Sequence, residues 1–213
     1  MIDAVCFDND GLTLETESAW TNAEIELFAR HGSAFSDDHK RYMIGSSAET
    51  AARKLEEMLG RPGDGPALWA ELHELVMAEV GRGVEPMPGA IELIDALRAA
   101  GTPVALVSNS AREFVELGLR GAGIYERFDA VFAREDVELG KPAPDLYLAA
   151  CAALGADPAA SVGLEDSDTG VAALKAARMF AIGVPSFPGV TLEQADLVAA
   201  SLADPAVHRA VGL

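Results

Sequence analysis

The chain has 213 residues, half of them hydrophobic, and it carries 34 acidic against 16 basic side chains, a formal charge of −18 at pH 7. This length and hydrophobic content predict a folded protein with one sizeable domain and a smaller insertion, and they exclude a disordered chain. The negative charge argues against nucleic-acid and anionic-membrane partners, and it requires a local positive centre, a metal ion or a lysine, wherever a phosphate ester would bind.

The cysteines and the start of the chain indicate the compartment. Cys6 and Cys151 lie far apart in the sequence without a CxxC spacing, which predicts buried, reduced thiols. The first residues lack the basic segment of a secretion signal, and no apolar run reaches the length of a membrane span. We therefore expect a cytoplasmic protein without a membrane partner, and a monomer. The four histidines are scattered without metal-ligand spacing, so none is assigned to a metal site.

The predicted elements begin with a strand at residues 2–7, a nearly continuous apolar run that is typical of a strand buried on both faces. Helical patterns follow without strands between them, at residues 18–31, 47–59 and 66–80. Because this helical block interrupts the chain directly after its first strand, we predict an inserted cap domain over residues 15–83. The catalytic core would then consist of residues 1–14 and 84–213.

From residue 87 onward the pattern changes to alternating helices and strands. Helices are predicted at 88–100, 112–119, 145–154 and 169–178, and strands at 104–107, 130–132, 161–164 and 180–184. Pro88 and Pro144 suit first-turn positions of helices, and Gly101 suits a helix end. Strand-helix alternation predicts a parallel sheet. The expected fold class is therefore α/β, a Rossmann-like three-layer core with a central parallel sheet and an inserted all-helical cap domain.

Polar side chains follow four of the predicted strands. They are Asp8-Asn9-Asp10, Ser108-Asn109-Ser110, Lys141 in the loop after the third strand, and Glu165-Asp166. Because the carboxyl ends of parallel strands lie on one edge of a sheet, we expect these side chains to converge there. Several carboxylates at one place require a cation, and oxygen ligands from Asp8, Asp166 and Glu165 suit Mg²⁺. Lys141 and the Ser108 hydroxyl would contact phosphoryl oxygens.

Four motifs, in this order, resemble those of the haloacid dehalogenase superfamily, in the subgroup with a helical cap between the first two motifs. They are Phe7-Asp8-Asn9-Asp10-Gly11-Leu12, Val107-Ser108-Asn109-Ser110, Gly140-Lys141-Pro142-Ala143-Pro144-Asp145 and Gly163-Leu164-Glu165-Asp166-Ser167. A single motif of this kind is weak evidence, but the ordered set spans nearly the whole chain.

The resemblance implies roles for these residues. Asp8 would be the nucleophile that forms an aspartyl-phosphate, and Asp10 would protonate the leaving oxygen and then activate water. Mg²⁺ would be held by the Asp8 carboxylate, the Asp10 backbone carbonyl and Asp166, with Glu165 beside them or acting indirectly. The implied phosphate-binding residues are Ser108, Asn109 and Lys141.

The resemblance also indicates a reaction. Dehalogenase and phosphonatase relatives lack the second aspartate, here Asp10, which favours a phosphate ester as substrate. The stretch 10–20 resembles phosphatases of 2-deoxyglucose 6-phosphate and hexitol phosphates, so we expect a small sugar or polyol phosphate. The stretch 43–47, however, lacks the basic residue that some sugar-phosphate members have nearby, unless Arg53 or Lys54 reaches the site.

Two other functions stay open. A sugar phosphomutase is the main alternative, although mutase relatives carry a histidine early in the first cap helix, where this chain has residues 18–22 without one. A non-catalytic binding module is disfavoured because every catalytic position is filled.

Each motif also has a purely structural interpretation. Residues 8–11 could form a capped turn, Ser108 and Asn109 could cap a helix, Lys141 could be a solvated loop lysine, and residues 165–166 could favour a helix N-terminus. The ordered presence of all four motifs favours function. Trp20 and Trp69 are assigned to packing of the cap, because aromatic residues on helical stripes are more often core than substrate contacts.

Overall fold

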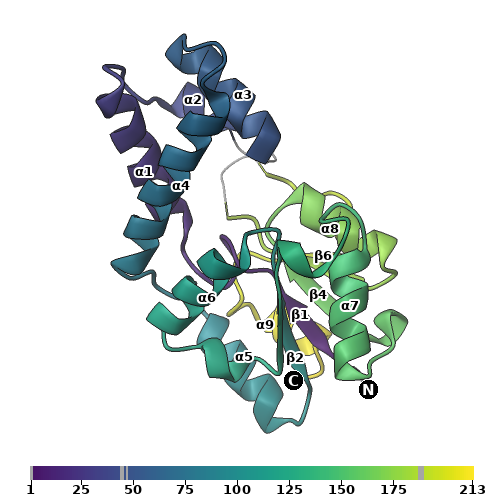
Figure 1. Cartoon of the computed structure of the whole chain (residues 1–213). Coiled ribbons are helices and arrows are strands. Elements are labelled where there is room, and N and C mark those ends of the chain that lie inside the picture. Colours follow the sequence, from purple (N-terminus) through teal and green to yellow (C-terminus); the bar gives the residue numbers. More distant parts are fainter. Residues whose placement is uncertain (1, 44–45, 47, 187–189) are drawn as a thin grey trace. The chain divides into compact units, whose positions relative to one another are not determined.

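The computed structural model describes residues 2–43, 46, 48–186 and 190–213 (Figure 1). The chain divides into two compact units. We call Met1–Glu15 with Val84–Leu213 the core unit, and Thr16–Gly83 the helical unit.

The core unit is built on one six-stranded parallel sheet in the order β3-β2-β1-β4-β5-β6. In chain order the strands are β1 (Val5–Phe7), β2 (Val104–Val107), β3 (Ala130–Phe132), β4 (Val162–Glu165), β5 (Phe180–Gly183) and β6 (Leu197–Val198). β1 is central, with Phe7 in register with Leu106 on one side and Leu164 on the other. The expected α/β class, with a parallel sheet and an inserted helical segment, is confirmed.

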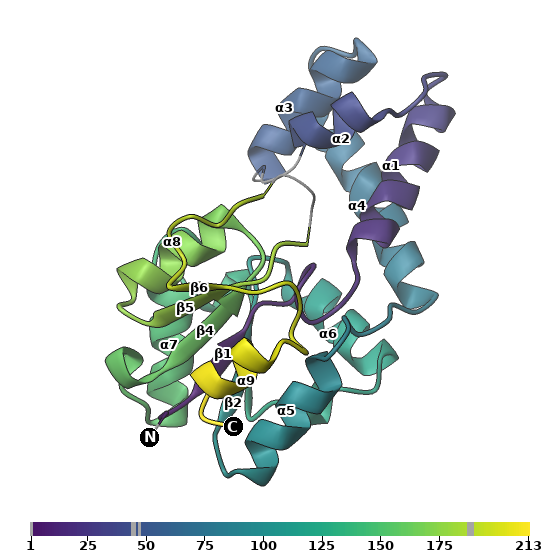
Figure 2. The same ribbon diagram turned by 180° about the vertical axis from the view of Figure 1, so that it is seen from behind.

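Helices cover both faces of this sheet (Figures 1 and 2). On one face lie α7 (Asp145–Leu154) and α8 (Asp168–Ala176), and on the other α5 (Ala90–Ala99) and α6 (Arg112–Gly121). Side chains alternate along the strands, so that Cys6 and Ala105 join the buried cluster formed with α7 and α8. Both faces of β1 are fully buried, which explains its unbroken apolar sequence.

Several details of the core unit differ from the sequence predictions. β6 and α9 (Pro205–Ala210) were not expected, nor were the 3₁₀ turns η1 (Tyr125–Arg127), η2 (Arg134–Asp136) and η3 (Pro158–Ala160). The first-turn placement of both prolines is wrong, since Pro88 precedes the Gly89 cap of α5 and Pro144 is itself the residue before α7. Gly89 has a φ of 86°, a left-handed conformation that delays the start of α5.

Among its described residues, the helical unit contains α1 (Glu17–Arg30), α2 (Asp37–Met43), α3 (Ala48–Leu59) and α4 (Gly65–Gly81). α1 and α3 both pack on α4 through buried residues such as Leu27, Leu55 and Leu72. α2 was not predicted, because it is short and mostly charged and buries only Lys40 and Met43. The predicted helix start at Ser47, and Ile44 and Gly45 before it, lie outside the described residues.

The chain leaves and re-enters the core unit through paired backbone. Leu14 and Pro86 form an antiparallel bridge, Glu15 N–H donates to the Glu85 carbonyl at 2.9 Å, and Met87 N–H donates to the Thr13 carbonyl at 2.9 Å. Within the described part of the chain, none of the helices combines the length and apolarity needed to cross a bilayer.

Candidate active site

The turn after β1 places Asp8 at the carboxyl edge of the sheet. Asp8 N–H donates to the Leu164 carbonyl at 3.0 Å, and the Thr13 hydroxyl donates to the Asp8 carbonyl at 2.5 Å. Gly11 in this turn has a φ of 78°, and a Cβ built there would meet Asp166 Oδ2 at 2.5 Å. A glycine is therefore required for two reasons, its backbone conformation and the close approach of the first and fourth motifs.

Lys141 lies between two carboxylates. Its Nζ is 2.5 Å from Asp8 Oδ1 and 2.6 Å from Glu165 Oε1, and it also donates to the Val107 carbonyl at 2.9 Å. The lysine side chain is only 3% exposed. Burial acts to lower the pKa of Lys141, but attraction from Asp8 and Glu165 outweighs burial and holds the pKa above its ordinary value. Lys141 is thus a permanently charged ammonium and not the solvated loop lysine of the structural interpretation.

Asn109 positions the loop that carries Lys141. Its side-chain Nδ2 donates to the Lys141 carbonyl at 3.0 Å, and its Oδ1 accepts from Lys141 N–H at 2.8 Å. The loop approaches so closely that a Cβ at Gly140 would meet Asn109 Oδ1 at 2.5 Å. Because both ends of the Asn109 amide are used in this pairing, the Asn109 side chain supports the Lys141 loop, and the contact of Asn109 with phosphate stays a prediction.

Asp10 is held by hydroxyls from the end of β2. Its Oδ2 accepts from Ser110 Oγ at 2.7 Å and from Ser108 Oγ at 3.2 Å. Ser108 is fully buried, and its oxygen also accepts the Ser110 N–H at 2.9 Å. The second motif therefore fixes the orientation of the Asp10 carboxylate, a contact that the sequence did not predict.

Glu165, the last residue of β4, is completely buried. Its Oε1 accepts from the Tyr147 hydroxyl at 2.5 Å as well as contacting Lys141, and its Oε2 accepts from Ser167 Oγ at 3.2 Å. A Cβ at Gly170 would come within 1.8 Å of this carboxylate, so α8 packs on Glu165 only because position 170 is glycine. Both carboxylate oxygens of Glu165 thus have protein partners.

Asp166 completes the group. Its Oδ2 accepts from Ser186 Oγ at 2.5 Å. Burial, followed by repulsion from Glu165, raises the pKa of Asp166 to about 7. Burial also raises the pKa of Asp8 well above its usual range, against the attraction of Lys141. The two carboxyl groups are therefore costly to keep ionised in the metal-free protein.

Three of these carboxylates can share a cation. Ligand oxygens of Asp8, Glu165 and Asp166 all lie within 4.8 Å of one another. Oxygens on opposite sides of Mg²⁺ are roughly 4 Å apart, and this hard ion prefers oxygen donors, usually one or two carboxylates together with water. Three negative groups beside one lysine also leave a surplus of negative charge that a divalent cation would neutralise. The residues present therefore fit a magnesium site.

The seven residues selected from the sequence lie on one edge of the core sheet, at or beyond the carboxyl ends of β1, β2, β3 and β4. Sequence reasoning missed the residues that support them, and these are Thr13, Ser110, Tyr147, Ser167 and Ser186. Of these, Ser110 in the second motif and Ser167 in the fourth carried a signal. Tyr147 is one residue of an apolar helix pattern and gave none.

Comparison with known proteins finds matches over most of the chain. A family model described as haloacid dehalogenase-like hydrolase matches residues 2–178. The chain is 33% identical over 192 residues to hexitol phosphatase B of Escherichia coli (strain K12), covering 86% of this chain and 83% of the relative. It is 29% identical over 206 residues to validoxylamine A 7'-phosphate phosphatase of Streptomyces hygroscopicus subsp. limoneus, covering 96% of each.

A solved structure shows the same fold. CbbY from Rhodobacter sphaeroides, in complex with phosphate, superposes with a TM-score of 0.81 at 28% identity, covering 96% of each chain.

Proposed function

Because this chain belongs to the haloacid dehalogenase-like hydrolases, we propose that it is a Mg²⁺-dependent phosphatase of a small sugar or polyol phosphate, with Asp8 as the nucleophile. The observation that supports this most directly is the meeting of Asp8, Glu165 and Asp166 around Lys141 at the edge of the sheet. This arrangement supplies a nucleophile, a fixed positive charge and a cation site in one place.

The proposed reaction has two steps. The Asp8 carboxylate attacks phosphorus, the bond between phosphorus and the ester oxygen breaks, and Asp10 donates a proton to the departing alcohol. Asp10 then accepts a proton from water, the water oxygen attacks phosphorus, and the bond to Asp8 breaks to release inorganic phosphate. The Ser110 and Ser108 hydroxyls keep the Asp10 carboxylate oriented for both proton transfers.

The charged groups around Asp8 have separate tasks. Lys141, which touches Asp8, stabilises the negative charge that builds on the phosphoryl oxygens. Asp8, the Asp10 carbonyl and Asp166 would hold Mg²⁺, which would supply further charge neutralisation. We assign Glu165 to the support of Lys141 and of the cation site, because both of its oxygens are already occupied.

The substrate assignment draws on relatives. Hexitol phosphatase B and validoxylamine A 7'-phosphate phosphatase are named for phosphate esters of hydroxylated compounds. We propose the same class of substrate here, with the helical unit acting as a cap and the protein acting in the cytoplasm as a monomer. A phosphomutase remains the alternative, but residues 18–22, in the first turns of α1, include no histidine.

The test is phosphate release from p-nitrophenyl phosphate with Mg²⁺. We expect Asp8→Asn to lose at least about 10³-fold in kcat and Asp10→Asn about 10²- to 10⁴-fold, because one removes the nucleophile and the other the general acid. Asp95→Asn, on the exposed surface of α5, is the matched control and should keep full activity. Equal rates in all four proteins would refute the mechanism.

A second assay separates the two candidate reactions. Incubation with glucose 1-phosphate should release free phosphate if the protein is a phosphatase. Accumulation of glucose 6-phosphate without free phosphate would instead identify a mutase.

A further inference from the structure

Asn9 lies between Asp8 and Asp10 in the turn after β1, and the proposed reaction gives its side chain no task. Asn9 is completely buried. A buried amide is expected to have hydrogen-bond partners at both its nitrogen and its oxygen, because an unpaired polar group away from water costs free energy. The contacts of Asn9 therefore indicate why an asparagine stands at this position.

The main chain of Asn9 builds the turn. Its carbonyl accepts hydrogen bonds from Thr13 N–H and Leu14 N–H, both at 3.0 Å. These are backbone contacts that any residue at position 9 could make. The turn therefore does not require the asparagine side chain.

The side chain of Asn9 contacts the proposed acid-base group. Asn9 Nδ2 donates to Asp10 Oδ1 at 3.2 Å, whereas the hydroxyls of Ser110 and Ser108 donate to the other carboxylate oxygen, Oδ2. Both oxygens of the Asp10 carboxylate are thus held, one by the preceding residue and one by the end of β2. Contacts at both oxygens oppose rotation of the carboxylate about its Cβ–Cγ bond.

The other end of the Asn9 amide is unpaired. Among the described residues, none donates a hydrogen bond to the buried Asn9 Oδ1. Asn109 differs, since both ends of its amide pair with the Lys141 backbone. An unpaired buried oxygen opposes folding, and a leucine of nearly the same shape would not carry this cost. The described contact that can offset this cost is the hydrogen bond to Asp10.

We propose that Asn9 is a positioning residue for Asp10, whose carboxylate plane it fixes for transfer of a proton to the departing alcohol. The inference rests on the proposed function, in which Asp10 is the general acid of the first step. A carboxyl group transfers a proton efficiently when it is held within hydrogen-bond reach of the leaving oxygen and in the right orientation. Asn9 acts through Asp10 and has no contact with the reacting atoms in this proposal.

The leaving group distinguishes this role from a purely structural one. Phenolate is a strong base that needs a proton as it departs, whereas p-nitrophenolate is a weaker base and needs the proton less. Phenyl phosphate and p-nitrophenyl phosphate otherwise present the same ring and the same phosphoryl group. For both esters kcat/KM covers the steps up to departure of the leaving group, so the ratio of the two kcat/KM values measures the assistance of the general acid.

The variants are Asn9→Leu and the smaller Asn9→Val, so that the test survives if one of them does not fold. With Mg²⁺, we expect kcat/KM for phenyl phosphate to fall about tenfold and kcat/KM for p-nitrophenyl phosphate to fall by less than about threefold. Asp10→Asn should shift the same ratio in the same direction and by more. The melting temperature of Asn9→Leu should equal or exceed that of the wild type, because this variant lacks the unpaired oxygen.

Ser161→Ala is the matched control, because it removes another buried polar side chain of the core unit. Ser161 precedes β4 at the amino edge of the sheet, and its hydroxyl donates to the Asp157 carbonyl at 2.8 Å. This variant should keep the wild-type ratio of the two kcat/KM values. If the Asn9 variants slowed both esters by the same factor, or slowed neither, the inference would be overturned.

The outcomes separate this inference from the proposed phosphatase. A wild-type protein that hydrolyses neither ester with Mg²⁺ would refute the phosphatase on which the inference rests. If the wild type hydrolysed both esters and Asp8→Asn hydrolysed neither, a wild-type ratio in the Asn9 variants would refute the role of Asn9 alone.

Discussion

The core unit and the helical unit each bury a lysine between two carboxylates. Lys141 lies between Asp8 and Glu165, and Lys40 lies between Glu24 and Glu17. The distances are similar, 2.5 and 2.6 Å in the first group against 3.0 and 3.2 Å in the second. These two groups, each a lysine with two carboxylates, are nevertheless expected to have different roles, because their surroundings differ.

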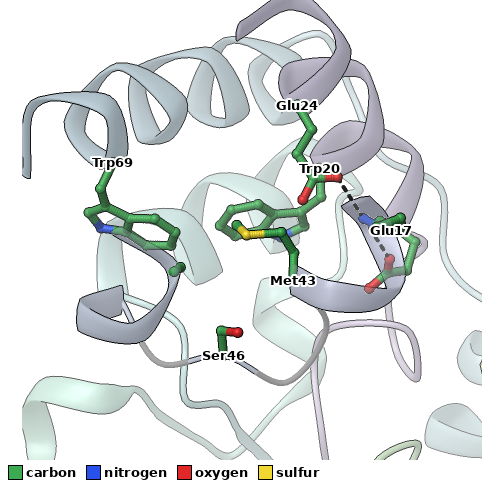
Figure 3. Close-up of a pocket in the computed structure, with 8 residues that line it drawn as sticks. Glu17, Trp20, Glu24, Met43, Ser46 and Trp69 are labelled. Carbon is green, nitrogen blue, oxygen red and sulfur yellow. Dashed lines mark hydrogen bonds and ion pairs between the residues drawn. The ribbon is translucent and has the colours of Figure 1, made fainter. Parts of the chain in front are cut away.

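The difference lies in the next neighbours. Beside Lys141 a third carboxylate, Asp166, is held at the edge of the sheet, which gives a surplus of negative charge for a cation to neutralise. Beside Lys40 the neighbours are Trp20 and Trp69, which line the same pocket of the helical unit and offer apolar surface (Figure 3). A buried lysine-carboxylate group is therefore not a functional signature by itself, and its role depends on what lies around it.

The largest expected effect is the loss of activity when Lys141 is replaced. This loss would distinguish the role of Lys141 in the core unit from that of Lys40 in the helical unit. Lys141→Met should lower kcat/KM at least about 10³-fold, because the variant lacks the charge that faces the phosphoryl group and the contact that orients Asp8. Steady-state kinetics with p-nitrophenyl phosphate measures this, with circular dichroism to show that the variant is folded.

Lys175→Met is the matched control for that change. Lys175 is an exposed lysine of α8 that pairs with Asp196 away from the site, and its loss should leave kcat/KM within about twofold of the wild type. If Lys141→Met retained a third of wild-type activity, Lys141 would have no more than the structural role of Lys40.

The next effect concerns stability in the helical unit. Lys40→Met leaves Glu24 buried without its cation and should reduce the free energy of unfolding by about 3 kcal/mol, measured by urea denaturation. Lys40→Met combined with Glu24→Leu should recover much of this loss, because no buried charge remains. Arg41→Met, on the exposed side of α2, serves as the control and should change stability by less than about 0.5 kcal/mol. An unchanged urea midpoint in Lys40→Met would mean that water, and not Lys40, stabilises the Glu24 carboxylate.

The free energy of unfolding of the metal-free protein should depend on pH through Asp166 of the core unit. The folded-state pKa of Asp166 is about 7, above the unfolded value of about 3.9, so the metal-free folded protein binds a proton that the unfolded chain releases. The stability from this group is full below about pH 4 and is lost as the pH rises through 7. With EDTA, the free energy of unfolding should fall by about 1–2 kcal/mol from about pH 6 to pH 8.

Mg²⁺ and a variant provide the check on that effect. Added Mg²⁺ should raise the melting temperature more at the higher pH, because ionised Asp166 is the better ligand. Asp166→Asn should lose the part of this pH dependence that Asp166 contributes, and the raised pKa of Asp8 should leave a remainder. Parallel curves for the wild type and Asp166→Asn in EDTA would contradict the assignment of the pKa to Asp166.

The smallest effect is expected at Tyr147. Tyr147→Phe keeps the ring, whose centroid is 5.1 Å from Lys141 Nζ, but removes the hydroxyl that donates to Glu165. We expect kcat/KM to fall about three- to tenfold and the Mg²⁺ concentration for half-maximal rate to shift, because Glu165 loses one of its donors. Tyr125→Phe on η1 is the control. If Tyr147→Phe and Tyr125→Phe had identical kinetics, the Tyr147 hydroxyl would have no role in the site.

The sequence predicted which side chains meet at the core edge, and the physical reason is local. Asp8, Ser108 and Glu165 each stand at the end of a short apolar strand, and parallel pairing alone brings such ends together. Helix and strand ranges from residue 87 onward were also close, because apolar periodicity there is strong and punctuated by glycine and proline.

What the sequence could not predict depends on tertiary packing. Tyr147 looks like any apolar position of α7, and only the packing of that helix brings its hydroxyl to Glu165. Lys40 lies in a charged stretch for which the sequence predicted no helix or strand, yet α2 forms there and buries it. The Asn109 side chain pairs with the Lys141 backbone, a contact between loops 32 residues apart that the sequence did not predict.

The pairing of residues 13–15 with 85–87 has a consequence for how such a protein can change over time. The two points where the chain departs from the sheet and comes back are neighbours, joined by their own backbone hydrogen bonds. The 68 residues of the helical unit are therefore a single insertion between two segments of the core unit that are paired with each other. Substitutions, insertions or exchange of the helical unit leave the strand register around Asp8 untouched, so the proposed cap can be altered without disturbing the proposed nucleophile.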